Sequence, residues 1–210
     1  METRLQDFRK ALAALDQLKA ETLFRQLTEE MSAIEAVERL VVPALEAIGR
    51  DWNEGLVALS QVYMSGRYCE ELVERVLPPS DPERKRQPRS AIAVLHDHHL
   101  LGKRIVYSIL RASGYELFDY GRMEVGELVE RVLADRIEVL LISVLMLPSA
   151  IKVREVRAGL DARGARVKIA VGGAPFLFDP ELWREVGADA MGETAADAVR
   201  IVSGWMEKSP

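Results

Sequence analysis

The chain has little cysteine and histidine and no excess of basic residues, and each of these features limits what it can be. It has a single cysteine, Cys69, so no internal disulfide can form, which favours a reducing compartment. Its 28 Lys and Arg are outnumbered by 33 Asp and Glu, which gives a net charge of −5. A nucleic-acid partner usually requires a basic surface, so this charge balance argues against one. Only three histidines are present, and all of them stand within His96–His99.

Long apolar runs are also lacking. The longest one, "VLLISVLMLPSAI" from Val139, is too short to span a bilayer and contains Pro148. The first ten residues, "METRLQDFRK", are charged and show no apolar signal-peptide region. Hydrophobic residues nevertheless make up 49% of the 210-residue chain, enough to bury a sizeable core. We therefore expect a cytoplasmic protein that binds neither nucleic acid nor a membrane.

Residues 1–82 have the periodicity of helices and few helix breakers. In "IEAVERLVVPALEAIGRDW" apolar residues recur every three or four positions, which is typical of an amphipathic helix. Pro43 interrupts this stretch and is expected to kink or restart the helix. The expected helices cover 3–19, 21–31, 34–52 and the stretch that follows Ser60 as N-cap. Four helices joined by short turns predict a small four-helix bundle.

The second half of the chain changes period after a proline-rich segment. "PPSDPERKRQPR" (78–89) has four prolines and no apolar periodicity, so it is expected to link the bundle to a second domain at 90–210. In that domain five short apolar stretches alternate with five helical ones. The expected strands lie in 90–95, 115–120, 137–145, 166–173 and 188–191. This alternation predicts a Rossmann-like (flavodoxin-like), doubly wound α/β fold with a five-stranded parallel sheet. In such folds ligands bind at the carboxyl ends of the strands.

The histidine cluster "HDHH" directly follows the first expected strand. One interpretation is a polar loop, and another is a zinc site. Zinc is disfavoured because adjacent side chains point to opposite sides and the chain offers no second His or Cys cluster.

A single histidine can instead bind a metal that brings its other ligands with it. Asp97, His99 and Gly102 form the pattern D-x-H-x-x-G. In this pattern one ring nitrogen of His99 can donate a hydrogen bond to Asp97, which leaves the other ring nitrogen of His99 free to bind a metal. Gly102 would allow a bulky ligand to approach the backbone closely.

This pattern resembles the signature of base-off/His-on cobalamin-binding domains, and two companion signatures follow in the family's order. Ser143 and Leu145 form S-x-L after the third strand. Ser149 matches the serine that hydrogen-bonds the motif aspartate in this family. Gly172 and Gly173 match the family's paired glycines after the fourth strand. Taken singly, Ser143 also fits an ordinary strand end and the two glycines an ordinary turn, but their conjunction is specific.

The resemblance implies a cobalamin whose cobalt is held by His99. Its nucleotide tail would enter a slot that the paired glycines leave open and that Ser143 and Leu145 line. The "MGET" stretch, with Thr194 at a helix N-terminus, would close this slot. The implied cofactor contacts are Asp97, His98, His99, Gly102, Ser143, Leu145, Ser149, Gly172, Gly173, Tyr63 and Met64, with His99 as the metal ligand.

The first half also resembles the helical cap of corrinoid methyl carriers. The similarity covers "VVPALEAIGRDWNEGLVALSQVYMSGR", in which Trp52 and Gly55 match the family's tryptophan and glycine. Trp52, Val62, Tyr63 and Met64 would cover the upper face of the cofactor and exclude water. The alternative is that these residues simply form the core of the bundle, and it applies most strongly to Trp52.

Cobalamin-binding domains of this family serve in mutases, in light-sensing regulators and in methyl transfer, and the sequence distinguishes among these three functions. Mutases work against a substrate-binding barrel, for which this chain has no room. Light-sensing regulators carry Glu-His in the cap, where this chain has Val62 and Tyr63, and usually add a DNA-binding domain. Two classes outside the family share the fold. Receiver domains need an aspartate after the third strand, where this chain has Ser143. Flavin carriers need a phosphate-binding loop after the first strand, where this chain has "HDHHLLG". The expected function is therefore methyl transfer.

The resemblance implies a non-catalytic corrinoid subunit that carries methyl between two partner enzymes. One is a substrate-specific methyltransferase, and the other is an acceptor methyltransferase with tetrahydrofolate as a candidate acceptor. A reductive activase is a further candidate partner. The sequence leaves methanol, methylamines, thiols and aryl methyl ethers open as methyl donors. A cobalamin-dependent sensor or regulatory protein, or a storage protein, is the alternative function.

Overall fold

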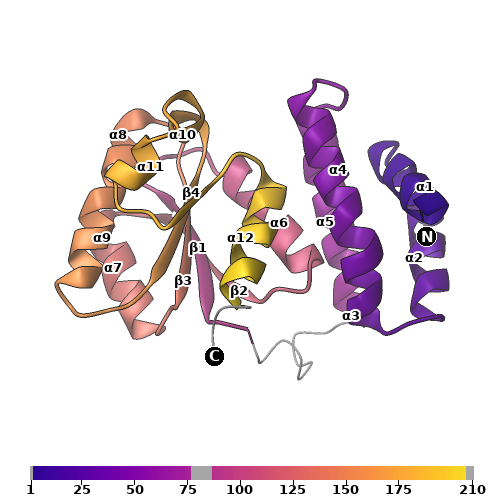
Figure 1. The fold of residues 1–210 in the computed structure, drawn as a ribbon, viewed down its shortest axis with the longest axis horizontal. Coiled ribbons are helices and arrows are strands. Elements are labelled where there is room, and N and C mark those ends of the chain that lie inside the picture. Colours follow the sequence, from indigo (N-terminus) through magenta and orange to yellow (C-terminus); the bar gives the residue numbers. More distant parts are fainter. Residues whose placement is uncertain (1, 77–86, 207–210) are drawn as a thin grey trace. The chain divides into compact units, whose positions relative to one another are not determined.

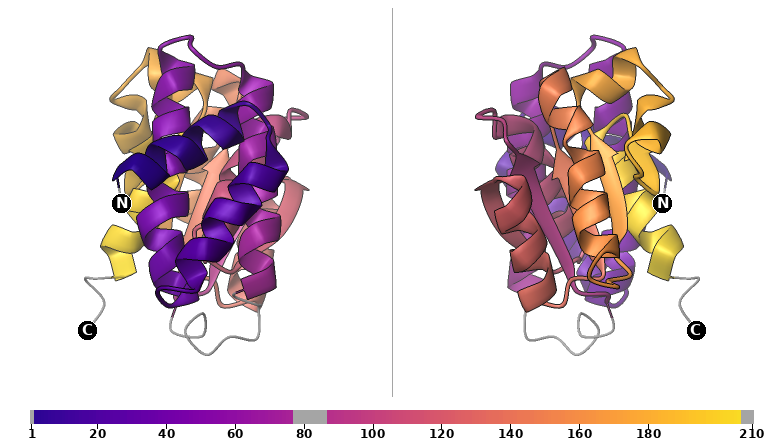
Figure 2. Two further views of the ribbon diagram at one scale, coloured as in Figure 1. Left: turned by 90° about the vertical axis from the view of Figure 1, so that its right-hand side faces the viewer. Right: turned by 90° about the vertical axis from the view of Figure 1, so that its left-hand side faces the viewer.

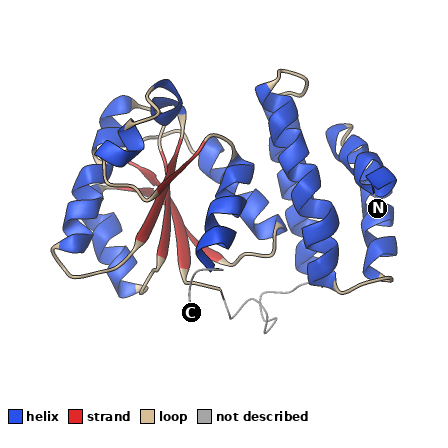
Figure 3. Ribbon diagram, in the orientation of Figure 1, coloured by secondary structure: helices blue, strands red, loops and turns tan. Residues whose placement is uncertain are grey.

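The structure is a computed structural model that describes residues 2–76 and 87–206. The chain divides into two compact units. One contains the helices that precede residue 77 together with Ser108–Glu116, and the other contains the five-stranded sheet (Figures 1 and 3). Residues 78–86 of the predicted linker lie outside the described residues, so the boundaries at 82 and 90 stay predictions. Of the described helices, none is both long and apolar enough to cross a bilayer.

The first unit contains the predicted four helical segments. Their elements are α1 (Glu2–Ala13), α2 (Gln17–Thr28), the continuous run of α3 (Ala33–Ala36), η1 (Val37–Val41) and α4 (Val42–Asn53), and α5 (Leu59–Val76). Several predicted boundaries are wrong, including both ends of the second helix, which was expected at 21–31 and spans Gln17–Thr28. The first helix ends before residue 19 because Leu15 has φ +58° and Asp16 caps α2 by accepting the Lys19 N–H at 3.1 Å. Ser60 is not an N-cap, because the Gln61 side chain accepts the Ala58 N–H at 2.7 Å and α5 begins at Leu59.

Pro43 restarts the third helix as expected. Proline has no N–H, and its ring clashes with the carbonyl four residues earlier, so regular α-helical hydrogen bonding cannot continue through it. The chain responds with the π-helical turn η1, in which the Val42 N–H donates to the Val37 carbonyl. The regular helix α4 then begins with Pro43 in its first turn, where a missing N–H is tolerated.

The second unit is a parallel sheet in the order β2-β1-β3-β4-β5. Its strands are β1 (Ser90–Leu95), β2 (Leu117–Met123), β3 (Val139–Ser143), β4 (Lys168–Gly172) and β5 (Ala190–Gly192). Its helices are α7 (Val125–Ala134), α8 (Leu147–Ile151), α9 (Val153–Asp161), α10 (Ala174–Phe178), α11 (Leu182–Glu185) and α12 (Ala195–Met206), together with α6 (Leu101–Ala112), whose residues from Ser108 on belong to the first unit. This confirms the predicted doubly wound α/β fold, and the short helix α10 is the element that the sequence did not predict.

Helices cover both faces of the sheet, which explains why its central strands are apolar throughout. Figures 1 and 2 show α7 and α9 over one face, while α6 and α12 lie over the other. Every residue of β1 is buried, and so are the first four residues of β3. Strands buried on both faces require such continuous apolar runs rather than alternation. By contrast β2, an edge strand, is mostly exposed or half-buried.

The strand order puts the topological switch point, here called the crevice, between the loops that follow β1 and β3. The chain leaves β1 toward β2 on one side and returns to β3 on the other, so the loops after β1 and β3 diverge. Ligands of doubly wound sheets bind at such a switch point. The predicted motif residues Asp97–His99 and Ser143–Leu145 follow these two strands, so the fold places them at the expected edge.

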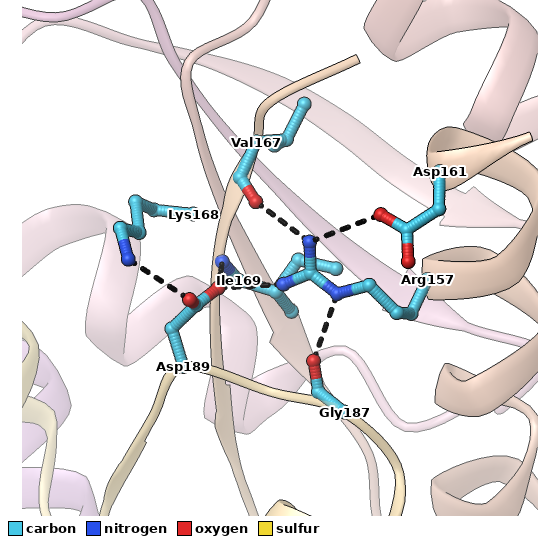
Figure 4. A network of polar contacts seen from close by, with 7 residues as sticks. All are labelled: Arg157, Asp161, Val167, Lys168, Ile169, Gly187 and Asp189. Atoms are coloured by element: carbon cyan, nitrogen blue, oxygen red, sulfur yellow. Dashed lines mark hydrogen bonds and ion pairs between the residues drawn. The ribbon is translucent and has the colours of Figure 1, made fainter. Parts of the chain in front are cut away.

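At the opposite edge, an arginine on α9 ties the amino ends of β4 and β5 together (Figure 4). Arg157 donates through Nε to the Gly187 carbonyl at 2.8 Å and through Nη1 to the Val167 carbonyl at 3.0 Å. Its Nη2 lies 2.6 Å from Oδ2 of Asp189, which also accepts the Ile169 N–H at 2.8 Å. All guanidinium nitrogens of Arg157 thus bind groups of the protein itself, so this network is structural.

Asp189→Asn is expected to weaken this network in a pH-dependent way. Burial acts to raise the pKa of Asp189, but the Ile169 N–H, Lys168 and Arg157 outweigh it and lower the pKa. The carboxylate therefore stabilises the fold above the unfolded pKa of about 3.9, and this contribution is lost as pH falls through the lower folded pKa. We expect Asp189→Asn to cost about 1–2 kcal/mol at pH 7, with the difference from wild type shrinking below about pH 4, in urea unfolding at both pH values.

Asp161→Asn provides the matched control for this experiment. Asp161 also faces Arg157, at 3.8 Å, but its side chain is 61% exposed. Exposed ion pairs contribute little, so this variant should stay within about 0.5 kcal/mol of wild type. Equal losses in the two variants would contradict the assignment of stability to Asp189.

Candidate functional site

The loop after β1 begins with a tight reversal of the chain. The Asp97 N–H donates to the Leu95 carbonyl, two residues back, at 2.7 Å, and the intervening His96 has φ +61°. These features define a γ-turn in its rare form with positive φ, which is strained for a residue other than glycine. The turn directs the Asp97 side chain inward, while His98 and His99 are exposed.

Asp97 joins the loop after β1 to the loop after β3. Its side chain is buried, with the residue only 5% exposed. Oδ2 accepts the backbone N–H groups of Leu145, at 2.6 Å, and Met146, at 3.1 Å. Oδ1 accepts a hydrogen bond from Ser149 Oγ at 2.9 Å, as the resemblance implied. Three donors converge on one carboxylate, so Asp97 holds the two sides of the crevice together.

His99 is left available at the rim of this crevice. No hydrogen bond joins His99 to Asp97 within the part of the chain that the structure describes. Oδ1 of Asp97 has a single donor, Ser149, and a carboxylate oxygen can accept two, so one acceptor position stays open. The predicted hydrogen bond from His99 therefore stays a prediction. The exposed ring of His99 is free to bind a ligand that approaches from outside.

His96 is held on the other side of the loop by two charged residues that the sequence interpretation did not assign. Its Nδ1 lies 2.6 Å from Oε2 of Glu124. Arg122 donates to Oε1 of Glu124 at 2.6 Å and to the His96 carbonyl at 3.3 Å. The hydrogen bond from His96 is the main reason that the pKa of Glu124 is lowered.

The strength of these contacts can be compared with the strain at His96. A residue other than glycine in this backbone conformation costs about 1–3 kcal/mol. The contact between His96 and Glu124 is partly exposed, with side-chain exposures of 41% and 46%, and even a charged pair at such exposure contributes only about 0.2–1 kcal/mol. The contacts of His96 therefore do not add net stability to the fold, and their effect is to fix the geometry of the turn.

Small residues line the ends of three adjacent strands. Ser143 of β3 is paired with Gly172 of β4, which is paired with Gly192 of β5. A Cβ atom added to Gly172 would lie 3.2 Å from the Gly192 carbonyl oxygen, and one added to Gly102 would lie 3.4 Å from Ser143 Oγ. Larger side chains would fill this row. Gly192, in the quoted "MGET" stretch, is a member of it that the sequence interpretation did not single out.

Gly173 is required for a different reason from the one that the sequence suggested. Its φ is +123°, and an added Cβ would lie 1.7 Å from the Val144 carbonyl oxygen. The space that a side chain would take at this position is occupied by the backbone after β3 and is not an open slot. An added Cβ at Gly172 would also approach backbone, at 3.2 Å from the Gly192 carbonyl oxygen, so the predicted room for a nucleotide tail stays a prediction.

The remaining predicted residues of the sheet unit have distinct surroundings. Leu145 donates its N–H to Asp97, while its side chain is exposed at the rim, beside the exposed Met146. Thr194 caps α12: its N–H donates to Asp197 Oδ2 at 2.7 Å, and its Oγ1 accepts the Asp197 N–H at 3.3 Å. This reciprocal capping occupies Thr194, so its part in closing a slot stays a prediction.

The predicted cap residues lie in the helical unit. Val62 is 3% exposed and packs in the bundle core, which favours the structural interpretation for this residue. Trp52 and Tyr63 are half-buried, and Met64 is exposed. Gly55 has φ +73° and ends α4, where glycine is favoured. Contact between Tyr63 or Met64 and a cofactor stays a prediction.

Comparison with known proteins identifies the family. A family model described as a B12 binding domain matches residues 90–202, and a second model with the same description matches residues 4–77. The chain belongs to the B12-binding family. It is a cobalamin-binding corrinoid protein of methyltransferase systems, and its helical half corresponds to the family's N-terminal domain.

The relatives and solved structures agree with this assignment. Over 201 residues the chain is 30% identical to trimethylamine corrinoid protein 2 of Methanosarcina mazei, covering 91% of this chain and 90% of the relative. It is 31% identical over 196 residues to the trimethylamine corrinoid protein of Methanosarcina barkeri, covering 89% and 88%. A cobalamin-binding protein from Desulfitobacterium hafniense has the same fold, with a TM-score of 0.79, 24% identity and coverages of 96% and 98%.

A homologous fold has also been crystallised with a methyltransferase. The methanol:cobalamin methyltransferase complex MtaBC from Methanosarcina barkeri contains a chain that matches with a TM-score of 0.68 and 21% identity, covering all of this chain and 81% of that one. At this identity the likeness shows the fold alone.

The residues at the carboxyl edge fit a cobalamin. Among the described side chains, no group of three His, Cys, Asp or Glu could hold a metal ion by itself, so a metal bound here must bring further ligands. The corrin ring does so, and the exposed imidazole of His99 offers one more nitrogen. Ser143, Gly172 and Gly192 keep the ends of the three strands free of large side chains, which is compatible with a slender group such as the nucleotide tail.

Proposed function

We propose that this protein binds cobalamin base-off, with His99 on the cobalt, and carries a methyl group between a substrate-specific methyltransferase and an acceptor methyltransferase. Bound cobalamin supplies a cobalt centre that can accept and release a methyl group. The observation that carries the proposal is the buried Asp97, which joins the loops after β1 and β3 and leaves His99 exposed at the switch point.

The protein's own residues have separate tasks in this proposal. One ring nitrogen of His99 would bind the metal. The other ring nitrogen of His99 would donate a hydrogen bond to Oδ1 of Asp97, which has an open acceptor position. Ser149 holds Asp97 through its hydroxyl. Leu145 and Met146 present apolar surface to the ring of the cofactor, and this surface also keeps water away from it.

The domain roles and partners follow from the same proposal. Residues 90–210 bind the cofactor, and residues 1–82 form a cap whose Tyr63 and Met64 exclude water from its upper face. The similarity to trimethylamine corrinoid proteins supports methylamines as the first donor class to test. The acceptor, with tetrahydrofolate as one candidate, and a reductive activase are the remaining proposed partners.

Electron paramagnetic resonance of the Co(II) protein tests the ligand. We expect coupling to one axial nitrogen, and this coupling should change when the protein is labelled with ¹⁵N-histidine. His99→Ala should abolish the protein-derived coupling, while His98→Ala, its exposed neighbour, should keep it. Persistence of the coupling in His99→Ala would disprove the ligand assignment.

The carrier role is tested with the same two variants. Protein loaded with methylcobalamin is mixed with an acceptor methyltransferase and tetrahydrofolate, and methyltetrahydrofolate is measured. Transfer should be fast for wild type and at least tenfold slower for His99→Ala, which corresponds to about 1.4 kcal/mol at the transition state, while His98→Ala, which loses an implied cofactor contact but not the metal ligand, should lie closer to wild type. Cobalamin binding without transfer to any acceptor would favour a storage or sensor protein.

A further inference from the structure

The scarcity of histidine makes His96 the most informative residue that the proposed function leaves unexplained. It occupies the centre of the γ-turn between β1 and Asp97, with φ +61°. Glycine adopts this conformation without strain, so glycine would suit the backbone better. A histidine at this position therefore has to be explained by its side chain.

The side chain of His96 closes a ring of contacts across the ends of β1 and β2. Nδ1 of His96 contacts Oε2 of Glu124, Oε1 of Glu124 accepts from Arg122, and Arg122 donates back to the His96 carbonyl. The backbone adds a further link, because the His96 N–H donates to the Met123 carbonyl at 2.9 Å. These contacts restrict residue 96 to one backbone conformation.

Glu124 is used on this ring instead of on its own helix. Glu124 is the N-cap residue of α7, where shorter side chains such as Asp or Ser are favoured, and its side chain makes no capping bond. Its two carboxylate oxygens contact His96 and Arg122 instead, so the carboxylate serves the loop after β1.

The loop that carries His99 is thus fixed on two sides. Residue 96 is tied to the end of β2 and the start of α7, and Asp97 is tied to Leu145, Met146 and Ser149 after β3. The γ-turn between these two attachments sets the direction in which the chain leaves toward residues 98 and 99. Loss of the first attachment would leave the turn free to rotate.

We propose that His96, Glu124 and Arg122 form a latch that positions the loop so that the imidazole of His99 points at the cobalt. The inference rests on the proposed role of His99. His96 is a positioning residue and does not touch the metal. The latch preorganises the ligand, and its removal should lower the fraction of cobalt that His99 holds, with little change in the stability of the fold.

Substitutions at position 96 separate the side chain from the backbone conformation. His96→Gly permits the γ-turn but removes the contact with Glu124. His96→Asn keeps a donor, because the Asn amide nitrogen takes the place of histidine Nδ1, and asparagine tolerates positive φ. Glu124→Ala removes the acceptor. Arg136→Gly is the matched control, since Arg136 has φ +53° in the same unit, far from this loop in the chain.

The readout is the ratio of Co(II) with a histidine nitrogen to Co(II) without one, measured by paramagnetic resonance. We expect a fall of about fivefold in His96→Gly and Glu124→Ala, which corresponds to about 1 kcal/mol at tenfold per 1.4 kcal/mol. His96→Asn and Arg136→Gly should stay within about twofold of wild type. If wild type shows histidine coupling and His96→Gly has the same ratio of histidine-bound to unbound Co(II), the latch would be overturned.

Hydrogen exchange in cofactor-free protein distinguishes failure of the latch from failure of the proposed function. The Asp97 amide, which closes the γ-turn, should exchange about fivefold faster in His96→Gly than in wild type, and at the wild-type rate in His96→Asn. Equal exchange rates in all three proteins would overturn the latch whatever cobalt binds. A different outcome is faster exchange of the Asp97 amide in His96→Gly, together with no histidine coupling in the paramagnetic resonance of wild type. It would support the role of His96 in holding the turn but refute His99 as the cobalt ligand.

Discussion

Gly173→Ala is expected to prevent stable folding of the sheet unit, with a loss of roughly 4 kcal/mol or more in the free energy of unfolding. Two independent causes act at this position. The backbone has φ +123°, which side-chain-bearing residues rarely adopt, and the new Cβ would lie 1.7 Å from the Val144 carbonyl oxygen. Because the obstacle is backbone between β3 and α8, no side chain can move aside to relieve it. Urea unfolding followed by circular dichroism measures the loss.

Two other glycines of the same unit provide controls. Gly126, in α7, has no atom within 4 Å of the place that a Cβ would take, so Gly126→Ala should stabilise the protein by about 0.5–1 kcal/mol. Gly102→Ala would bring its Cβ to 3.4 Å from Ser143 Oγ, an ordinary contact, and should fold normally. A Gly173→Ala protein as stable as these two would show that the loop after β3 can move away.

The difference between Gly173 and its neighbour bears on how cofactor binding should be tested. A side chain at 173 would meet backbone, so a substitution there cannot separate cofactor binding from folding. Gly172→Ala is the better probe of the slot, since its Cβ would approach the Gly192 carbonyl at 3.2 Å, where a small shift can relieve the contact. Substitution at Gly173 reports on folding alone.

The central strands were predictable because their apolar runs are unambiguous, whereas the edge strand β2, expected at 115–120, lies at Leu117–Met123 and is mostly exposed or half-buried. "SAIAVL" coincides with β1 (Ser90–Leu95), and the run around "VLLIS" contains β3 (Val139–Ser143). The helix boundaries near Leu15 and Ser60 were not predictable to the residue, because they depend on Asp16 and Gln61, whose competing capping bonds have no unique local signature. Hydrophobic periodicity locates elements, and capping decides where they end.

The site was predictable only where family motifs describe it. The hydrogen bond between Ser149 and Asp97 follows from the resemblance and is present at 2.9 Å. The contact of His96 with Glu124 joins residues 28 positions apart, and no local spacing indicates it. Gly192 joins the row of small residues through the pairing of β4 with β5, which only the sheet register establishes.

Asp97→Ala is expected to cost about 3 kcal/mol of unfolding free energy and to disconnect the two loops of the crevice. The substitution removes the acceptor of three hydrogen bonds and leaves the Leu145 and Met146 N–H groups and the Ser149 hydroxyl without it. The Ser149 hydroxyl is buried, and a buried donor that loses its acceptor costs more than the bond itself contributed. Urea unfolding of cofactor-free protein measures this cost without any assumption about the ligand.

Two milder substitutions divide the loss between its parts. Asp97→Asn keeps one oxygen for the N–H groups of Leu145 and Met146, and the Ser149 hydroxyl can rotate to accept from the new amide, so about 1 kcal/mol should be lost. Ser149→Ala removes one of the three donors and should cost about 1 kcal/mol as well. If all three variants lost the same amount, the backbone N–H groups would contribute nothing, and Asp97 would not be what holds the loops after β1 and β3 together.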